Sequence, residues 1–105
     1  MTIDAKELLK LKEDVRNLVS EAGRSADKII NNVVPSCDTF SLSFLLGDTE
    51  EARGAAGVLA RLYPEDKEIK QMFKDAAIAH ILAYKGRDSF MEQCKCEKKF
   101  DKQVI

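Results

Sequence analysis

The chain has 105 residues, of which 45% are hydrophobic and 33% are charged, and its formal net charge is −1. These values are typical of one folded domain and exclude a disordered chain, and the small net charge gives no electrostatic reason to bind a polyanion. Glycine and proline are scarce, at five and two residues, which favours helix. The sequence therefore predicts a single all-α domain over residues 1–105, either a compact bundle or stacked hairpins of about five helices.

The first predicted element is a long amphipathic helix over residues 4–33. Apolar side chains recur along it at three- and four-residue steps, which is the pattern of a helix with one buried face. We expect it to be the longest helix of the chain and to turn this face towards the core or a partner. The apolar stripe begins with Leu8, Leu11, Val15 and Leu18.

A short helix over residues 37–46 is predicted next, because Pro35 disfavours continuation of the first helix. Phe40 and Phe44 in this segment fit helical spacing, but they also fit the strict alternation of a strand. We favour the helix over the strand, because a lone strand would leave both of its edges unpaired.

The third predicted helix spans residues 49–62 and follows a turn at Gly47. Asp48 and Glu51 have the spacing of a capping box, in which side chains satisfy the free N–H groups at the start of a helix. Small side chains then recur at four-residue steps, so we expect another helix to pack closely against this one.

The fourth predicted helix spans residues 66–85 and is expected to be the buried centre of the fold over residues 67–85. Its second half is almost entirely apolar, so it has no polar face to turn towards water. Gly86 is expected to cap its end. A last helix over residues 88–100 and a frayed tail over residues 101–105 complete the predicted chain.

One segment carries a local resemblance to a known family. Its residues are Gly47-Asp48-Thr49-Glu50-Glu51-Ala52, followed by Leu59, Pro64 and Asp66. This spacing resembles the second helix of a tetratricopeptide repeat, and the likeness is confined to residues 47–66. The resemblance implies helical hairpins stacked side by side and a protein-binding scaffold without catalytic activity.

Three cysteines offer the most specific chemistry. Cys94 and Cys96 are separated by one residue, and two thiols so close in sequence can bind a soft metal or form a redox disulfide. Together with Cys37 and His80 they would make a set of ligands that zinc accepts. A metal- or redox-responsive regulator is therefore one alternative function. The other interpretation is free thiols, because residues two apart in a helix point about 200° away from each other.

The chain contains no recognisable catalytic motif. His80 is the only histidine, and the nearest acidic residues, Asp75 and Asp88, are not at helical spacing to it. We therefore interpret His80 as a core or helix-contact residue and expect no catalytic residues and no required cofactor. The first residues lead directly into the amphipathic pattern with no apolar export segment, so a cytoplasmic location is expected.

The C-terminal end is mildly basic and supports a second alternative function. It carries Lys95, Lys98, Lys99 and Lys102. These cations would suit a nucleic-acid-associated accessory protein, but they also suit the solvated end of a helix, where cations complement the helix dipole. No apolar run approaches the ~20 residues needed to span a bilayer, so neither a membrane nor a nucleic acid is the expected partner.

The leading hypothesis is a small helical interaction or scaffold module that binds a protein partner or a second copy of itself. The apolar side chains are numerous for a core of this size, and small domains commonly supplement their cores by association. A homodimer is therefore expected. The candidate interface residues are Leu8, Leu11, Val15, Leu18, Phe40, Phe44, Phe90 and Met91.

Overall fold

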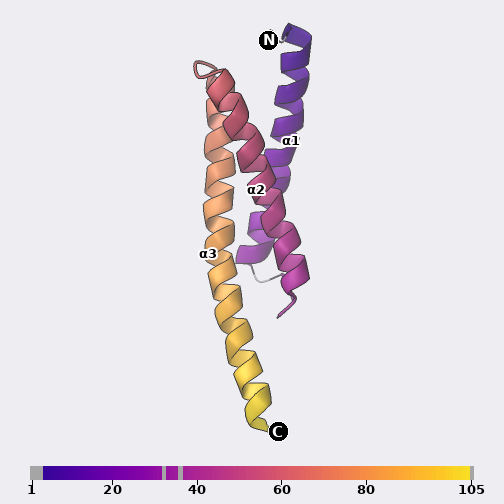
Figure 1. Ribbon diagram of the computed structural model, residues 1–105, viewed down its shortest axis with the longest axis vertical. Helices are drawn as coiled ribbons and strands as arrows, with labels where there is room; N and C mark the ends of the chain where they lie inside the picture. Colours follow the sequence, from indigo (N-terminus) through magenta and orange to yellow (C-terminus); the bar gives the residue numbers. More distant parts are fainter. Residues whose placement is uncertain (1–3, 32, 36, 105) are drawn as a thin grey trace.

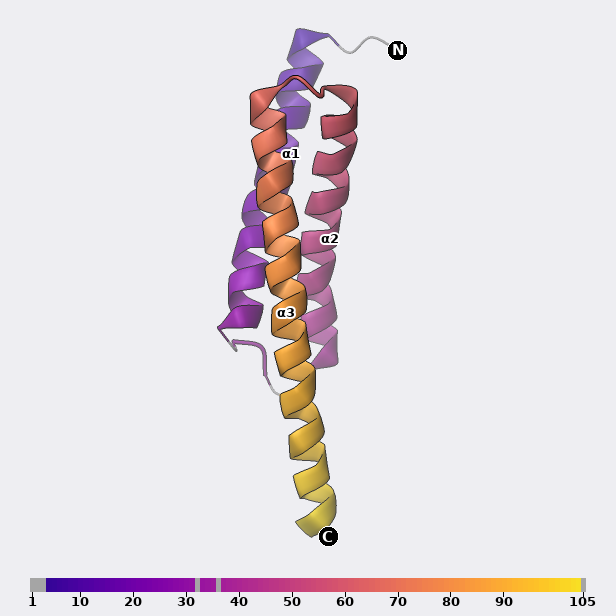
Figure 2. The same ribbon diagram turned by 90° about the vertical axis from the view of Figure 1, so that its left-hand side faces the viewer.

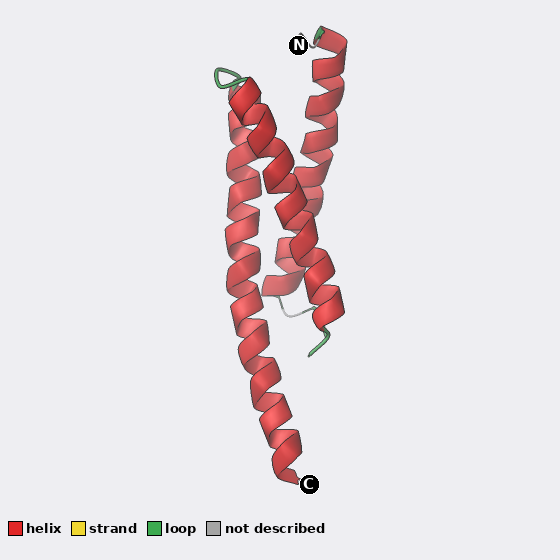
Figure 3. Cartoon of the chain, viewed as in Figure 1, coloured by secondary structure: helices red, strands yellow, loops and turns green. Residues whose placement is uncertain are grey.

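The computed structural model describes residues 4–31, 33–35 and 37–104, with the side chains of these residues up to Lys95. The described residues form three helices, which are α1 (Ala5–Ile30), α2 (Thr39–Leu62) and α3 (Lys67–Val104). Successive helices run in opposite directions (Figure 1), and the part of the chain drawn in Figure 3 contains helices and loops but no strand. The predicted all-α class is confirmed.

The structure corrects the predicted five helices to three. The segments predicted at 37–46 and 49–62 form one helix, α2, and those predicted at 66–85 and 88–100 form another, α3. The strand alternative for residues 37–46 is wrong. α3 also continues through most of the predicted frayed tail to Val104, whereas the first helix ends at Ile30, earlier than predicted.

The predicted breaks at Gly47 and Gly86 are wrong, because both glycines lie inside continuous helices. Neither has the positive φ that a glycine at a helix end commonly adopts. Asp48, predicted to start a helix, instead accepts a hydrogen bond of 2.9 Å from the buried hydroxyl of Ser25 in α1. A glycine inside a helix costs ~1 kcal/mol, and the contacts of α2 and α3 with their neighbours outweigh that cost.

Each helix begins at an aspartate whose carboxylate accepts a backbone N–H of the first turn, the usual role of an N-cap. The caps are Asp4, Asp38 and Asp66, which accept from the N–H groups of Glu7, Ser41 and Ile69 at 2.9, 3.0 and 3.1 Å. An aspartate therefore lies at the start of each of the three helices, whereas the glycines lie inside them.

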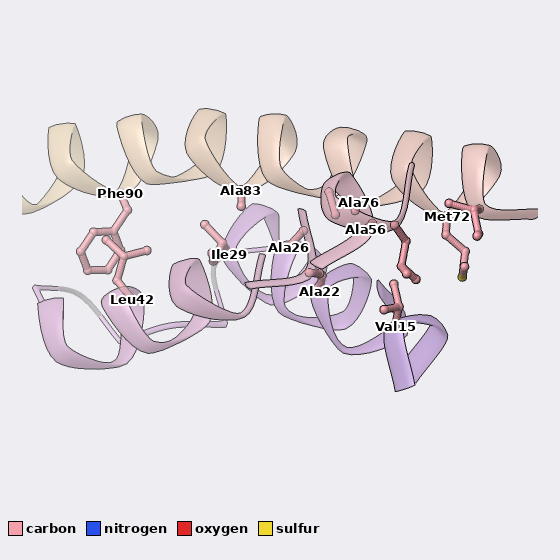
Figure 4. Close-up of a cluster of buried hydrophobic side chains, with 14 residues drawn as sticks. Val15, Ala22, Ala26, Ile29, Leu42, Ala56, Met72, Ala76, Ala83 and Phe90 are labelled. Atoms are coloured by element: carbon pink, nitrogen blue, oxygen red, sulfur yellow. The ribbon is translucent and has the colours of Figure 1, made fainter. Parts of the chain in front are cut away.

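The core lies between the three helices, each of which packs against both others. Its side chains point into the shared space in Figure 4, where Phe90 of α3 lies towards Leu42 of α2. The buried apolar residues are Val15, Ala22, Ala26, Ile29, Leu42, Ala52, Ala56, Leu59, Ile69, Met72, Ala76, Ala79, Ala83 and Phe90. Half of them are alanines, so the helices are close together and each contact buries little apolar area.

The molecule is elongated, with extents of 64 × 21 × 18 Å. Figure 2 shows the C-terminal part of α3 extending beyond the ends of α1 and α2. With 38 residues, α3 is longer than α1 with 26, so the prediction that the first helix is the longest is wrong.

The prediction that α3 is buried on every side is also wrong. Ile69, Ala76 and Ala83 are fully buried, but Ile78 and Ile81 are each 54% exposed. In a bundle of three helices each helix has two neighbours, so one side of α3 faces outwards even where its side chains are apolar.

Gly86 lies where α1 packs closely against α3. A Cβ atom on Gly86 would lie 2.6 Å from Cγ2 of Ile29 and 3.3 Å from the backbone nitrogen of Ile30. Because part of this contact is backbone, it cannot be relieved by turning a side chain. Glycine at this position therefore permits the distance between the two helices.

We expect Gly86→Ala to lower the free energy of unfolding by about 1–3 kcal/mol through overpacking, despite the better helix propensity of alanine. Gly54→Ala is the matched control, because Gly54 is exposed and its Cβ position has no neighbour within 4 Å. That substitution should raise stability by up to about 1 kcal/mol. Urea unfolding followed by circular dichroism measures both, and stabilisation by Gly86→Ala would contradict the close contact.

Acid should weaken the start of α3. The pKa of Asp66 lies below its usual value of 3.8. The larger cause is the hydrogen bond from Lys12, and the next is the hydrogen bond from the N–H of Ile69. Lys12 Nζ lies 2.6 Å from Asp66 Oδ2. A lowered pKa in the folded state contributes stability above the unfolded pKa, and this contribution is lost as the pH falls through the folded pKa.

Stability measured from about pH 5 down to pH 2 should therefore fall less steeply in Asp66→Asn than in the unmodified chain. Lys12→Met, which removes the largest cause of the shift, should reduce the slope in the same direction. Identical slopes in all three chains would contradict a role for this carboxylate.

Candidate interaction surface

The structure separates the eight predicted interface residues into two groups. Six of them pack inside this chain's own bundle. Val15 and Phe90 are buried in the core, and the other four are partly buried against it, namely Leu8, Leu11, Leu18 and Met91. Phe40 and Phe44 differ, because they are 80% and 68% exposed. These two side chains mark the candidate site.

Phe40 and Phe44 lie at the start of α2, beside the segment that connects it to α1. The Asp38 cap fixes where α2 starts, so the two rings emerge one helical turn apart on its outer side. Val33, in the connection before the cap, is 64% exposed. We call Val33, Phe40 and Phe44 the phenylalanine patch.

A hollow of about 480 Å³ adjoins the patch between α1, the connection and α2. Its lining is Lys28, Val33, Val34, Pro35, Phe40, Ser41, Phe44 and Leu45. Lys28 is the only charged residue in this lining, so the hollow is largely apolar. Isolated apolar residues are normal on a protein surface, but a contiguous apolar group with a hollow is typical of an interaction site.

The outer side of α2 near the patch carries no charge. Residues 39–47 contain no Asp, Glu, Lys or Arg. Gly47 follows Phe44 by three residues and is exposed, and a Cβ atom there would meet nothing within 4 Å. Within the described structure, Gly47 therefore has no packing reason to lack a side chain, and the space that a side chain would occupy is open.

A disulfide lies at the same end of the bundle. It joins Cys37, in the α1–α2 connection, to Cys94 of α3, with 57 residues of sequence separation and Cα atoms 5.1 Å apart. Cys94 is buried, Cys37 is half-buried, and Cys37 has a φ of 63°. The expectation of free thiols is therefore wrong for these two cysteines.

The predicted metal ligands do not come together. Cys37 and Cys94 are bonded to each other, whereas His80 lies 14 residues before Cys94 on the same helix, about 21 Å along its axis. The sequence placed His80 and Cys94 on two separate helices divided at Gly86, whereas both lie on the continuous helix α3. The side chain of Cys96 lies outside the described residues, and those that are described contain no group of three or more metal-binding side chains.

His80 instead lies half-buried in a groove of about 760 Å³ between α2 and α3. Its ring centroid is 4.7 Å from that of Tyr84, and no described residue forms a hydrogen bond with its buried Nδ1. The Tyr84 hydroxyl donates a hydrogen bond to the Glu50 carboxylate. This hydrogen bond raises the pKa of Tyr84, and burial raises it by a smaller amount. Glu50 is the carboxylate in the described lining of the groove, and it accepts from Tyr84, with no described hydrogen bond that would let it orient His80 as a general base.

The candidate nucleic-acid residues fall mostly beyond what the structure describes. Lys95 is exposed on α3, while the side chains of Lys98, Lys99 and Lys102 lie outside the described residues. The basic end of α3 therefore stays a prediction.

Comparison with protein-family models, curated protein sequences and solved structures finds no match to this chain. The resemblance of residues 47–66 to a tetratricopeptide hairpin thus stays a prediction. Among the described helices, none is both long and apolar enough to cross a bilayer.

We expect reduction of the Cys37–Cys94 disulfide to destabilise the fold. Closing a chain segment of this length removes entropy from the unfolded state that corresponds to about 4 kcal/mol. Urea unfolding in the presence and absence of dithiothreitol measures the difference. Cys96→Ser, which leaves the disulfide intact, should keep the full response to dithiothreitol, whereas Cys37→Ser should lose it. Equal stability of the unmodified chain in both conditions would contradict the bond.

Proposed function

We propose that this chain is a small, non-catalytic protein–protein interaction module that binds a second copy of itself through the phenylalanine patch. The observation that carries the proposal is the exposure of Phe40 and Phe44 on one side of α2, next to an apolar hollow. The other predicted interface residues bury their apolar side chains inside the bundle. Burial against a partner would therefore remove more exposed apolar surface at these two rings than at the other six residues.

The free energy available from the patch agrees with a dimer of modest affinity. Burying one phenylalanine side chain contributes about 1.5–3 kcal/mol, so the four rings of a symmetric dimer contribute roughly 6–12 kcal/mol. Association itself costs an estimated 4–15 kcal/mol. The two quantities are similar in size, which favours dissociation constants in the micromolar range or weaker over a permanent assembly.

The uncharged character of residues 39–47 favours a second copy as the partner. In a two-fold symmetric dimer the same surface meets itself, so a surface with a net charge would meet a surface of the same charge. This segment carries none. If two α2 helices pair in opposite directions about an axis between residues 43 and 44, Phe40 of one copy lies opposite Gly47 of the other. The absence of a side chain at Gly47 then leaves room for the ring.

The alternative functions have less support. The metal-dependent regulator loses the ligand set on which it depended, because His80 is far from Cys37 and Cys94 along the bundle. The nucleic-acid accessory and the cytoplasmic location stay predictions. The tetratricopeptide resemblance, also a prediction, implies protein binding and so agrees with the function proposed here.

We expect the double variant Phe40→Ser/Phe44→Ser to remain monomeric where the unmodified chain associates. Sedimentation velocity over a concentration series should show the unmodified chain rising from 11.8 kDa towards twice that mass. The variant should retain its helicity, because both rings are exposed.

Leu9→Ser is the matched control, because Leu9 is 66% exposed near the N-terminus of α1, at the other end of the bundle from the patch (Figure 1). It should associate like the unmodified chain. Gly47→Gln, which places a side chain opposite Phe40 of the other copy, should weaken association. A constant mass of 11.8 kDa for the unmodified chain at millimolar concentration would contradict the proposal.

A further inference from the structure

We infer that the Cys37–Cys94 disulfide is a redox-controlled clasp that sets the shape of the phenylalanine patch, so that its reduction by a thiol weakens self-association. The inference rests on the proposed function, because it concerns the regulation of the same surface. It assigns the disulfide a role beyond the stability that any crosslink of this length confers.

The clasp acts on the connection between α1 and α2. This connection supplies Val33 of the patch and, with Val34 and Pro35, one wall of the apolar hollow. The connection reaches α3 at Cys37, whose Cα atom lies 5.1 Å from that of Cys94. Its described backbone hydrogen bonds are local, from Val33 to Lys28, from Asp38 to Pro35 and from Thr39 to Cys37. The bond through Cys37 is the covalent attachment that holds this segment against α3.

The two ends of the disulfide differ in their freedom to move. Cys94 is 5% exposed and lies one helical turn after the core residue Phe90, so α3 holds it in place. Cys37 lies in the connection, and its φ of 63° is in the left-handed region that residues other than glycine rarely adopt. When the bond opens, Cys37 can leave this conformation while Cys94 stays. The movement therefore falls on the connection and on the adjacent Asp38 cap.

The position of Cys37 immediately before that cap transmits the change to the rings. Asp38 accepts hydrogen bonds from both the N–H and the hydroxyl of Ser41, and these bonds fix the first turn of α2, which includes Phe40. If the connection becomes free, the first turn can fray and Phe40 is no longer held one turn from Phe44. Among the described residues of the connection, Val34 is the one that packs against the core, where it is half-buried. The helices supply the remaining core contacts, so the bundle can persist while the patch loses its shape.

The reaction requires two equivalents of a small thiol or one of a dithiol. A thiolate attacks Sγ of Cys37, the less buried sulfur, forming a mixed disulfide and expelling the Cys94 thiolate, which takes up a proton. A second thiolate then attacks the outer sulfur of the mixed disulfide and releases Cys37. The protein disulfide gains two electrons and two protons, and the two small thiols leave as their own disulfide. In a reducing compartment disulfides are commonly transient and regulatory, which suits a surface that opens and closes with redox state.

The test uses the full chain carrying Cys96→Ser, so that the third thiol cannot link copies covalently. Sedimentation equilibrium gives the dissociation constant for self-association under oxidising conditions and in dithiothreitol. Hydrogen exchange in the same samples reports the amides of residues 33–41 and, as the internal reference, those of the α1 core. The matched variant Cys37→Ser/Cys96→Ser has no clasp under either condition.

We expect reduction to weaken self-association about tenfold or more and to leave residues 33–41 with little protection, while the core amides of α1 stay protected and lose only what the lower global stability accounts for. The Cys37→Ser/Cys96→Ser variant should have the dissociation constant and the exchange rates of the reduced chain, and dithiothreitol should not change them. Association that is equally strong in both redox states overturns the clasp and leaves the proposed dimer standing. Complete loss of protection in α1 on reduction also overturns it, because the bundle would then have unfolded as a whole. No association in either state overturns both proposals.

Discussion

The close approach of the helices is the constraint on which the rest of this structure depends. Half of the buried apolar residues are alanines, and at Gly86 even one methyl group would collide with α1. Small side chains let the backbones come near one another, but each contributes little apolar area. Larger apolar side chains are consequently left over, and several of them lie outside the bundle. The exposed rings of Phe40 and Phe44 follow from how the core is built.

The same thin core explains why a crosslink matters in this chain. A small domain with limited apolar burial commonly relies on a further source of stability. The disulfide supplies it at the end of the bundle where the α1–α2 connection leaves the helices. Polar contacts add to it elsewhere, as in the hydrogen bond between Ser25 and Asp48 across α1 and α2. The packing, the crosslink and the exposed phenylalanine patch are thus linked features of one small core.

Sequence periodicity was sufficient to predict the class of fold and much of the helical content. It identified α1 to within a few residues and favoured helix over strand for residues 37–46. It failed at Gly47 and Gly86, because the local preference of glycine to end a helix is worth only ~1 kcal/mol and tertiary contacts outweigh it. Without those two breaks, five predicted helices become three.

The candidate site was predictable only in part. Phe40 and Phe44 were among the predicted interface residues, but spacing could not distinguish them from Val15 or Phe90, which have the same character and are buried. That distinction depends on which helix faces meet, and hence on the fold. The Cys37–Cys94 pairing was missed for a related reason: 57 residues separate the two thiols, and the nearness of Cys96 to Cys94 in sequence suggested a different partner.

The disulfide also divides the chain into two parts of different topology. Residues 37–94 form a closed covalent ring that contains all of α2 and most of α3, whereas α1 lies outside it as a linear segment. A single cut by a protease in the α2–α3 turn near Pro64 would open the ring without separating its halves. A single cut before Cys37 would instead release α1, with its share of the core. Cleavage in the turn therefore leaves the chain in one covalent piece, whereas cleavage in the connection that leads to the phenylalanine patch does not.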